Sequence, residues 1–220
     1  MFLGHFGAAL AAKPLAPRAS LGTLVAAALF LDLVWPALVL VGVERVRIDP
    51  GNTAVTPLDF EHYPVTHGLV AVVAWAVAFG AVYAWRTGWR RGAVVAGALV
   101  ASHWVLDLVV HRPDLPVVWS GPKVGLGLWR SVPATLAVEL AVFVGGLLLY
   151  ARATAPRDAV GRYALAGFVA LLLGIYAANL LGPPPPSARA VGAAGLGLWL
   201  FVLWAAWIDR HRTSGTAAPA

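Results

Sequence analysis

The chain has 220 residues, of which 60% are hydrophobic and only 12% are charged, and its mean hydropathy is +0.78. A soluble domain has about 45–50% apolar and about 25% charged residues, so this composition indicates an integral membrane protein. The formal charge of +6 is then a topology signal, and a nucleic-acid-binding module is excluded. Because the chain has no cysteine, disulfides, thiolate nucleophiles and cysteine-ligated metals are excluded as well.

The apolar segments predict an all-α polytopic bundle. The first of them, residues 2–12, would form a helix only about 18 Å long, which is too short for a membrane core about 30 Å thick. It therefore predicts a re-entrant N-terminal helix that packs inside the bundle. Residues 1–212 then form one transmembrane domain, and the tail at 213–220 is predicted to be disordered. The six predicted spans are residues 21–43, 65–85, 93–110, 133–150, 163–181 and 191–208.

The distribution of Lys and Arg predicts the orientation of this bundle. Ten of the 16 basic residues fall on the side that carries the loops 13–20, 86–92 and 151–162, and six fall on the other side. Cytoplasmic loops carry the positive excess, so we expect both termini to be cytoplasmic. The two longest connections, residues 44–64 and 111–132, then face the extracytoplasmic side.

A few ionisable side chains interrupt the predicted spans. Such groups are costly in a membrane, usually face the bundle interior and indicate a functional site. His103, Asp107 and His111 follow one another at a spacing of four, which places them on one helix face. In the predicted topology His67 starts the second span on the same outer side. The interrupting residues are Asp32, His67, His103, Asp107 and Glu139, and His5 of the re-entrant helix would reach the depth of Asp32.

Imidazole and carboxylate together are typical ligands of zinc and other divalent first-row metals. A bound cation would also explain how several carboxylates coexist in a medium of low dielectric constant. We therefore expect His67, His103 and Asp107, joined by Asp32 and His5, to bind zinc or manganese. Glu139, or Asp32 as a spare carboxylate, is the candidate general base for hydrolysis of an ester or phosphoester.

Four stretches, GHFGAAL, ALFLDLVWP, HYPVTHGLV and SHWVLDLVVH, carry a family resemblance. They follow the order of the characteristic segments of the YdjM-like family of LexA-binding, inner-membrane-associated, metal-dependent hydrolases, and the similarity covers residues 1–115. It implies a multi-pass protein of the bacterial inner membrane with a metal-dependent hydrolase site. The family's second Asp and following His are missing from LDLVW at 31–35, and Gly68 replaces its Ser. The positions that match the family's metal motifs are His5, Asp32, His62, His67, His103 and Asp107.

These observations predict a membrane-embedded hydrolase whose neighbours are membrane lipids and whose substrate is lipid-derived. A transporter or proton-coupled permease is the main alternative, since buried Asp, Glu and His also mark ion pathways. A haem-b protein with His67 and His103 as axial ligands and a scaffold subunit without chemistry are further alternatives. Three residues have a second interpretation as well: His62 as a solvated loop residue, His111 as an interfacial residue, and Glu139 as a buried partner of Arg130 or Arg112.

Overall fold

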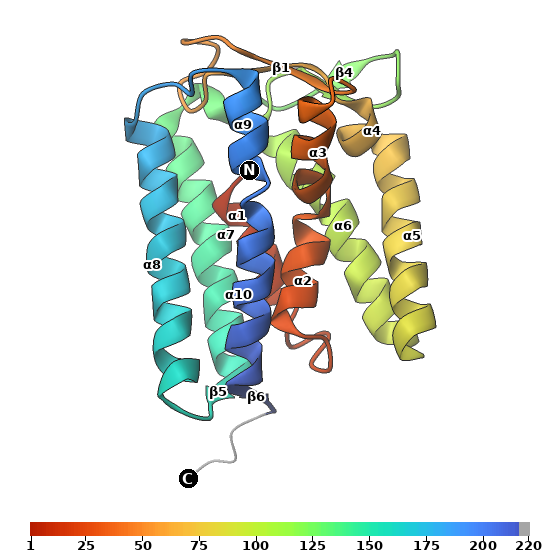
Figure 1. Cartoon of the computed structure of the whole chain (residues 1–220), viewed down its shortest axis with the longest axis vertical. Coiled ribbons are helices and arrows are strands. Elements are labelled where there is room, and N and C mark those ends of the chain that lie inside the picture. Colours follow the sequence, from red (N-terminus) through yellow and green to blue (C-terminus); the bar gives the residue numbers. More distant parts are fainter. Residues whose placement is uncertain (216–220) are drawn as a thin grey trace.

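The computed structural model describes residues 1–215 and forms a bundle of helices with three short two-stranded sheets (Figure 1). Five helices are long and apolar enough to cross a membrane, and there are six spans when the bent pair α2 and α3 counts as one. The predicted all-α membrane bundle is thus confirmed. The first half contains α1 Leu3–Ala11, α2 Leu21–Ala28, α3 Phe30–Leu40, β1 Arg45–Ile48, β2 Leu58–His62, α4 Pro64–His67, α5 Leu69–Thr87 and α6 Arg90–Val110. The second half contains β3 Leu115–Pro116, β4 Lys123–Val124, the 3₁₀ helix Leu128–Arg130, α7 Val132–Ala153, β5 Thr154–Pro156, α8 Ala159–Leu181, α9 Ala188–Gly195, α10 Leu198–Arg210 and β6 Arg212–Ser214.

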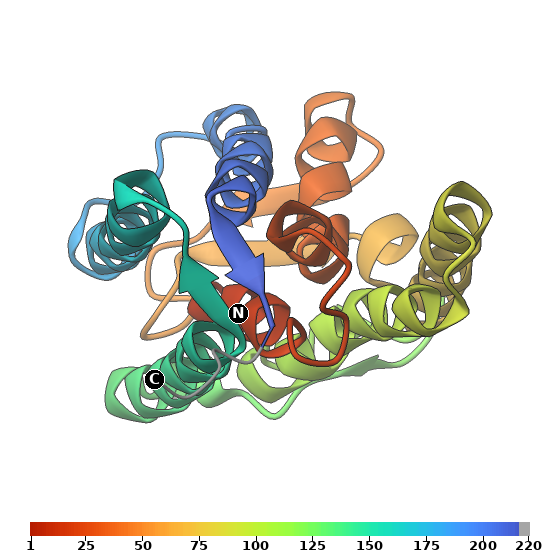
Figure 2. The same ribbon diagram turned by 90° about the horizontal axis from the view of Figure 1, so that it is seen from below.

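The short helix α1 lies inside the bundle, as the re-entrant prediction required. Seen from below, it is enclosed by α7, α6 and α2 (Figure 2). Its contact with α7 is a backbone-to-backbone approach: a Cβ atom added to Gly146 would lie 2.0 Å from the carbonyl oxygen of Gly7. Small residues allow such close packing of membrane helices. At the lower end, Lys13 Nζ donates to the Ala19 carbonyl at 2.8 Å and to the Asp209 carboxylate at 2.9 Å.

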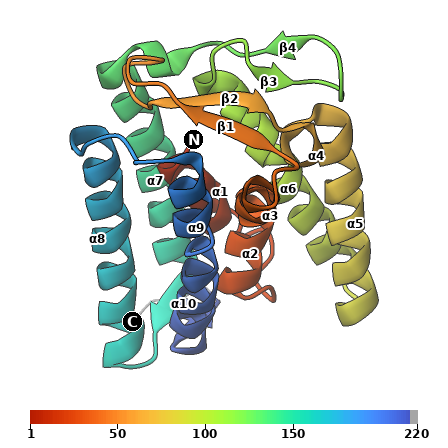
Figure 3. The same cartoon turned by 45° about the horizontal axis from the view of Figure 1, so that its top comes forward.

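Three of the predicted spans are divided where the sequence suggested continuous helices; in the last of them, Leu196 and Gly197 separate α9 from α10. The first is bent by 56° between α2 and α3. The second begins with the single turn α4, and α5 starts only after Gly68, which has an extended backbone with ψ of 130°. Helix α4 lies at the upper end of α5, and α3 contacts both α4 and α6 (Figure 3).

The loops collect at two opposite ends of the bundle. The hairpins β1–β2 and β3–β4 lie at one end, and β5–β6 lies at the other, together with the connections after α1 and α5 (Figures 1 and 3). Strand β6 corrects one expectation, because Thr213 and Ser214 of the predicted disordered tail pair with β5 through Ala155 and Thr154. Residues 216–220 of that tail lie outside the described residues.

The outer surface of the helices is apolar. On α5, which packs mainly on α6, Val70, Val73 and Val77 are all exposed. A helix that is apolar on the side facing away from the protein is suited to contact lipid. The hydrophobic core and the polar residues discussed below lie on the inner side of α6, around α1 and α2.

Candidate metal centre

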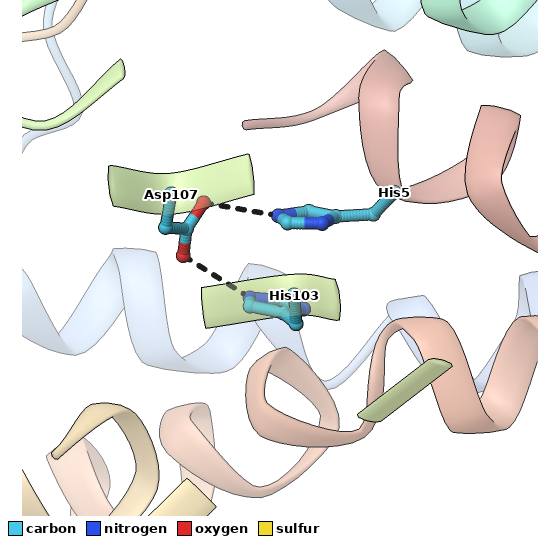
Figure 4. A group of neighbouring side chains, drawn as sticks. All are labelled: His5, His103 and Asp107. Atoms are coloured by element: carbon cyan, nitrogen blue, oxygen red, sulfur yellow. Dashed lines mark hydrogen bonds and ion pairs between the residues drawn. The ribbon is translucent and has the colours of Figure 1, made fainter. Parts of the chain in front are cut away.

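A cluster of buried imidazole and carboxylate groups lies where α1, α3, α4 and α6 meet. His103 and Asp107 project from successive turns of α6, and His5 of α1 faces them (Figure 4). The structure contains two overlapping sets of donor atoms within 4.8 Å of one another: His5, His103 and Asp107, and Asp32, His67 and His103. The sequence prediction that these five residues converge is therefore supported by the geometry of the side chains.

The donor atoms have the separations that ligands of one small cation require. Asp32 Oδ1 lies 3.5 Å from His67 Nε2 and 3.6 Å from His103 Nε2. Asp107 Oδ2 lies 3.7 Å and 3.2 Å from the same two nitrogens. Ligands about 2.0–2.1 Å from a tetrahedral zinc ion are about 3.3 Å from one another. These four distances are close to those between ligands of one zinc ion, and the two donor sets share His103.

The second nitrogen of His103 fixes which atom faces this centre. His103 Nδ1 lies 2.8 Å from the carbonyl oxygen of Ala28, the last residue of α2. A carbonyl only accepts, so in the neutral ring Nδ1 carries the proton and Nε2 carries the lone pair. His103 Nε2 is buried and makes no hydrogen bond within residues 1–215. A buried nitrogen of this kind, flanked by two carboxylate oxygens, fits a cation ligand.

Asp107 connects α1 to the imidazoles through its two oxygens. Its Oδ1 lies 3.1 Å from His5 Nε2 and 2.5 Å from the Met1 nitrogen, whereas Oδ2 faces His103. The His5 ring also stacks on the His103 ring, with centroids 3.6 Å apart and planes 8° from parallel. His5 thus orients Asp107 and His103 from the side of α1, and its own Nδ1 has no hydrogen bond in the described part of the chain.

Access to the centre is uneven. The side chains of His5, His67, His103 and Asp107 are at most 5% exposed, whereas that of Asp32 is 30% exposed. Asp32 is therefore the side chain of the cluster that is open to the surroundings of the protein.

Glu139 does not belong to either donor set. Its buried Oε2 accepts from the backbone nitrogen of Gly4, at 3.3 Å, in the first turn of α1. The first N–H groups of a helix lack intrahelical acceptors, and a carboxylate there also favours the positive end of the helix dipole. Among the described residues, Glu139 forms an ion pair with neither Arg130 nor Arg112. Arg112 instead pairs with Asp59 and Asp114. The interpretation of Glu139 as an arginine partner was wrong.

Two other candidates lie away from the centre, on the side of the hairpins. His62 on β2 packs edge-on against Trp119, with ring centroids 5.4 Å apart, and lines a surface pocket of about 250 Å³. His62 belongs to neither donor set, so the structure does not bring it to the metal centre. His111 lies 2.9 Å from Asp114 Oδ1 and 3.3 Å from the Tyr63 hydroxyl, so it belongs to a separate polar cluster.

Sequence reasoning missed a hydrogen-bonded group behind His67. Glu44, which follows α3, is buried, and its Oε1 accepts from the backbone nitrogens of Val65 and Thr66 at 2.8 and 2.9 Å. Its Oε2 accepts from the Thr66 hydroxyl at 2.7 Å, and that hydroxyl oxygen lies 2.7 Å from His67 Nδ1. The only sequence signal was a carboxylate at the very end of an apolar span, and nothing local connects it to Thr66.

A haem does not fit between His67 and His103. Their ring centroids are 5.3 Å apart with planes at 67°, and Asp107 Oδ2 lies within 3.7 Å of both Nε2 atoms. Axial ligands need a porphyrin plane between them, and a carboxylate occupies that space.

The fold and the site define the chain as a polytopic membrane bundle with a buried histidine–carboxylate cluster. No family model, no curated protein and no solved structure matches it. The geometry of the cluster is therefore the guide to its function.

Proposed function

We propose that this chain is a membrane-embedded, metal-dependent hydrolase that cleaves an ester or a phosphoester. The observation that carries the proposal is that His67 Nε2 and His103 Nε2 each lie within 3.7 Å of a carboxylate oxygen of Asp32 and of one of Asp107. Zinc and manganese both accept imidazole and carboxylate ligands, and either ion fits this proposal.

Each residue has a separate role in the proposed reaction. A bound divalent ion would supply an acidified water and a Lewis acid for the scissile group. His67 and His103 would hold the ion through neutral imidazole nitrogens, and Asp107 would hold it through a carboxylate oxygen. Asp32 is the only one of these side chains with substantial exposure, at 30%. Its carboxylate is therefore the candidate to accept the proton of the attacking water and to contact the substrate.

A lipid-derived substrate is part of the same proposal. The centre lies inside a bundle whose outer surface is apolar, so a substrate with an acyl chain can approach from the bilayer. The resemblance to the YdjM-like family, whose four stretches contain all five residues of the two donor sets, supports a bacterial inner-membrane location. The distribution of Lys and Arg supports cytoplasmic termini.

Elemental analysis of the full-length protein, purified in detergent without chelators, tests the proposal. We expect one zinc or manganese per chain in the wild type and in the control variant His62→Ala, which removes an imidazole outside the centre. His103→Ala and Asp107→Asn should lose the metal. Hydrolysis of fluorogenic carboxyl and phosphate esters in mixed micelles should decrease in parallel with the metal content.

Two results would contradict the proposed function. A metal-free wild type would remove the cation on which the chemistry depends. A metal-loaded wild type that hydrolyses no ester, yet takes up solute in proteoliposomes only under a proton gradient, would identify the chain as a transporter.

A further inference from the structure

A polar chain leads from the loop after α3 to the back of His67. It consists of the Glu44 carboxylate, the Thr66 hydroxyl and the imidazole of His67, joined by two contacts of 2.7 Å. All three side chains are buried, with exposed fractions of 1%, 0% and 4%. Glu44 is therefore a buried carboxylate that forms no ion pair with a basic side chain among residues 1–215.

The chemistry of the three groups sets the direction of the hydrogen bonds. A carboxylate only accepts, so the Thr66 hydroxyl donates its one proton to Glu44 Oε2. The Thr66 oxygen can then only accept from His67, which requires the proton of the neutral ring to be on Nδ1. His67 Nε2 is left with its lone pair, and this is the atom that lies 3.5 Å from Asp32 Oδ1.

We propose that Glu44 and Thr66 are positioning residues that hold His67 in the Nδ1–H tautomer, so that Nε2 is available to a divalent cation. This inference rests on the proposed metal centre. It adds how the protein sets which nitrogen of a ligand histidine carries the proton. Outer hydrogen-bond partners of this kind orient a ligand histidine and increase its basicity. For His103 the Ala28 carbonyl has the same role, so both imidazoles present Nε2 to the same point.

Glu44 also fixes where His67 lies. It accepts the backbone N–H groups of Val65 and Thr66, and so it holds the first turn of α4 in the way that a capping side chain does. Gly68 then ends this turn, since a Cβ atom at that position would lie 2.5 Å from the Pro64 carbonyl oxygen. The end of α4 at Gly68 and the buried Glu44 carboxylate together place the His67 ring against α6.

Replacement of Glu44 by glutamine reverses the chain of hydrogen bonds. The amide oxygen still accepts from the backbone, but the amide NH₂ donates to the Thr66 oxygen. The Thr66 hydroxyl then donates to His67 Nδ1, and the ring proton moves to Nε2. Thr66→Val removes the connection while the backbone contacts of Glu44 remain, and Thr66→Ser restores it.

The test uses the full-length protein labelled with ¹⁵N-histidine, with His67→Ala to assign the His67 resonances. In metal-free protein, ¹H–¹⁵N correlations should report the Nδ1–H tautomer of His67 in the wild type and in Thr66→Ser, and the Nε2–H tautomer in Glu44→Gln. In a Co²⁺ titration, Glu44→Gln and Thr66→Val should bind about 10- to 100-fold more weakly than the wild type, and Thr66→Ser should bind like it.

Matched controls separate this role from a loss of packing. Thr135→Val removes another buried hydroxyl, and Glu61→Gln removes an exposed carboxylate on β2; both should bind Co²⁺ like the wild type. Nδ1–H in Glu44→Gln, or unchanged Co²⁺ binding in Thr66→Val while His67→Ala binds weakly, would overturn the positioning role and leave the metal centre intact. Unchanged Co²⁺ binding in His67→Ala would overturn the metal centre itself.

Discussion

Replacing Gly146 by alanine is expected to displace α1 and with it His5. The new Cβ atom would lie 2.0 Å from the Gly7 carbonyl oxygen and 2.9 Å from the Gly7 Cα. The preferred van der Waals separation of non-bonded heavy atoms is about 3.5 Å, so α1 must move away from α7 by about 1.5 Å. Both partners are backbone atoms, and a change of rotamer therefore cannot relieve the contact.

The size of the effect follows from this displacement. Overpacking of a close contact costs about 1–3 kcal/mol, so the variant should unfold at a lower temperature in detergent. The hydrogen bond between His5 and Asp107, now 3.1 Å, would lengthen beyond a useful distance. Loss of an outer partner of a metal ligand weakens metal affinity about 10- to 100-fold, which a Co²⁺ titration measures.

The neighbouring residue offers a close control. A Cβ atom at Gly145 has no heavy atom within 4 Å, so Gly145→Ala should match the wild type in melting temperature and in Co²⁺ affinity. Equal behaviour of the Gly146→Ala and Gly145→Ala variants would refute the reasoning that the α1–α7 contact positions His5.

Three further predictions concern other parts of the fold. Gly68→Ala places a Cβ atom 2.5 Å from the Pro64 carbonyl, so it should lower both the melting temperature and the Co²⁺ affinity; an unchanged affinity would show that the break before α5 does not position the site. Glu139→Ala should destabilise the fold by about 1–3 kcal/mol because buried N–H groups lose their acceptor, whereas Glu139→Gln should be close to wild type in stability and hydrolysis; inactive Glu139→Gln would instead identify a general base. The hydrogen bond from His211 holds the pKa of Asp158 below its usual value, so the melting-temperature advantage of the wild type over Asp158→Asn should be constant above about pH 5 and shrink as the pH falls toward the lowered pKa.

Much of the site could be predicted because local spacing determines it. His103 and Asp107 lie four residues apart on α6, and helical geometry alone places them on one face. The depth of His5 followed from the length of the apolar segment before Lys13, since a helix too short to span must end inside the bundle. The all-α architecture followed from the length and hydropathy of the apolar segments.

The remaining features depend on contacts between distant segments. His67 faces α6 because the chain breaks at Gly68, and a single glycine in an apolar span does not reveal a break. Glu44 and Thr66 are 22 positions apart, and their contact is visible only once α3 and α4 are packed together. The hydrogen bond from the Gly4 nitrogen to Glu139 joins α1 to α7, which are 135 positions apart at this contact, so the sequence gives no sign of it.

The most direct test of the metal centre is X-ray absorption at the zinc edge of the purified, zinc-loaded protein. We expect four nitrogen or oxygen neighbours at about 2.0–2.2 Å, with the outer-shell scattering of two imidazole rings. His67→Ala and His103→Ala should each reduce that signal to one ring, and His62→Ala should leave it unchanged. A wild-type spectrum without imidazole scattering, or one that His103→Ala does not alter, would contradict the assignment of these residues as ligands.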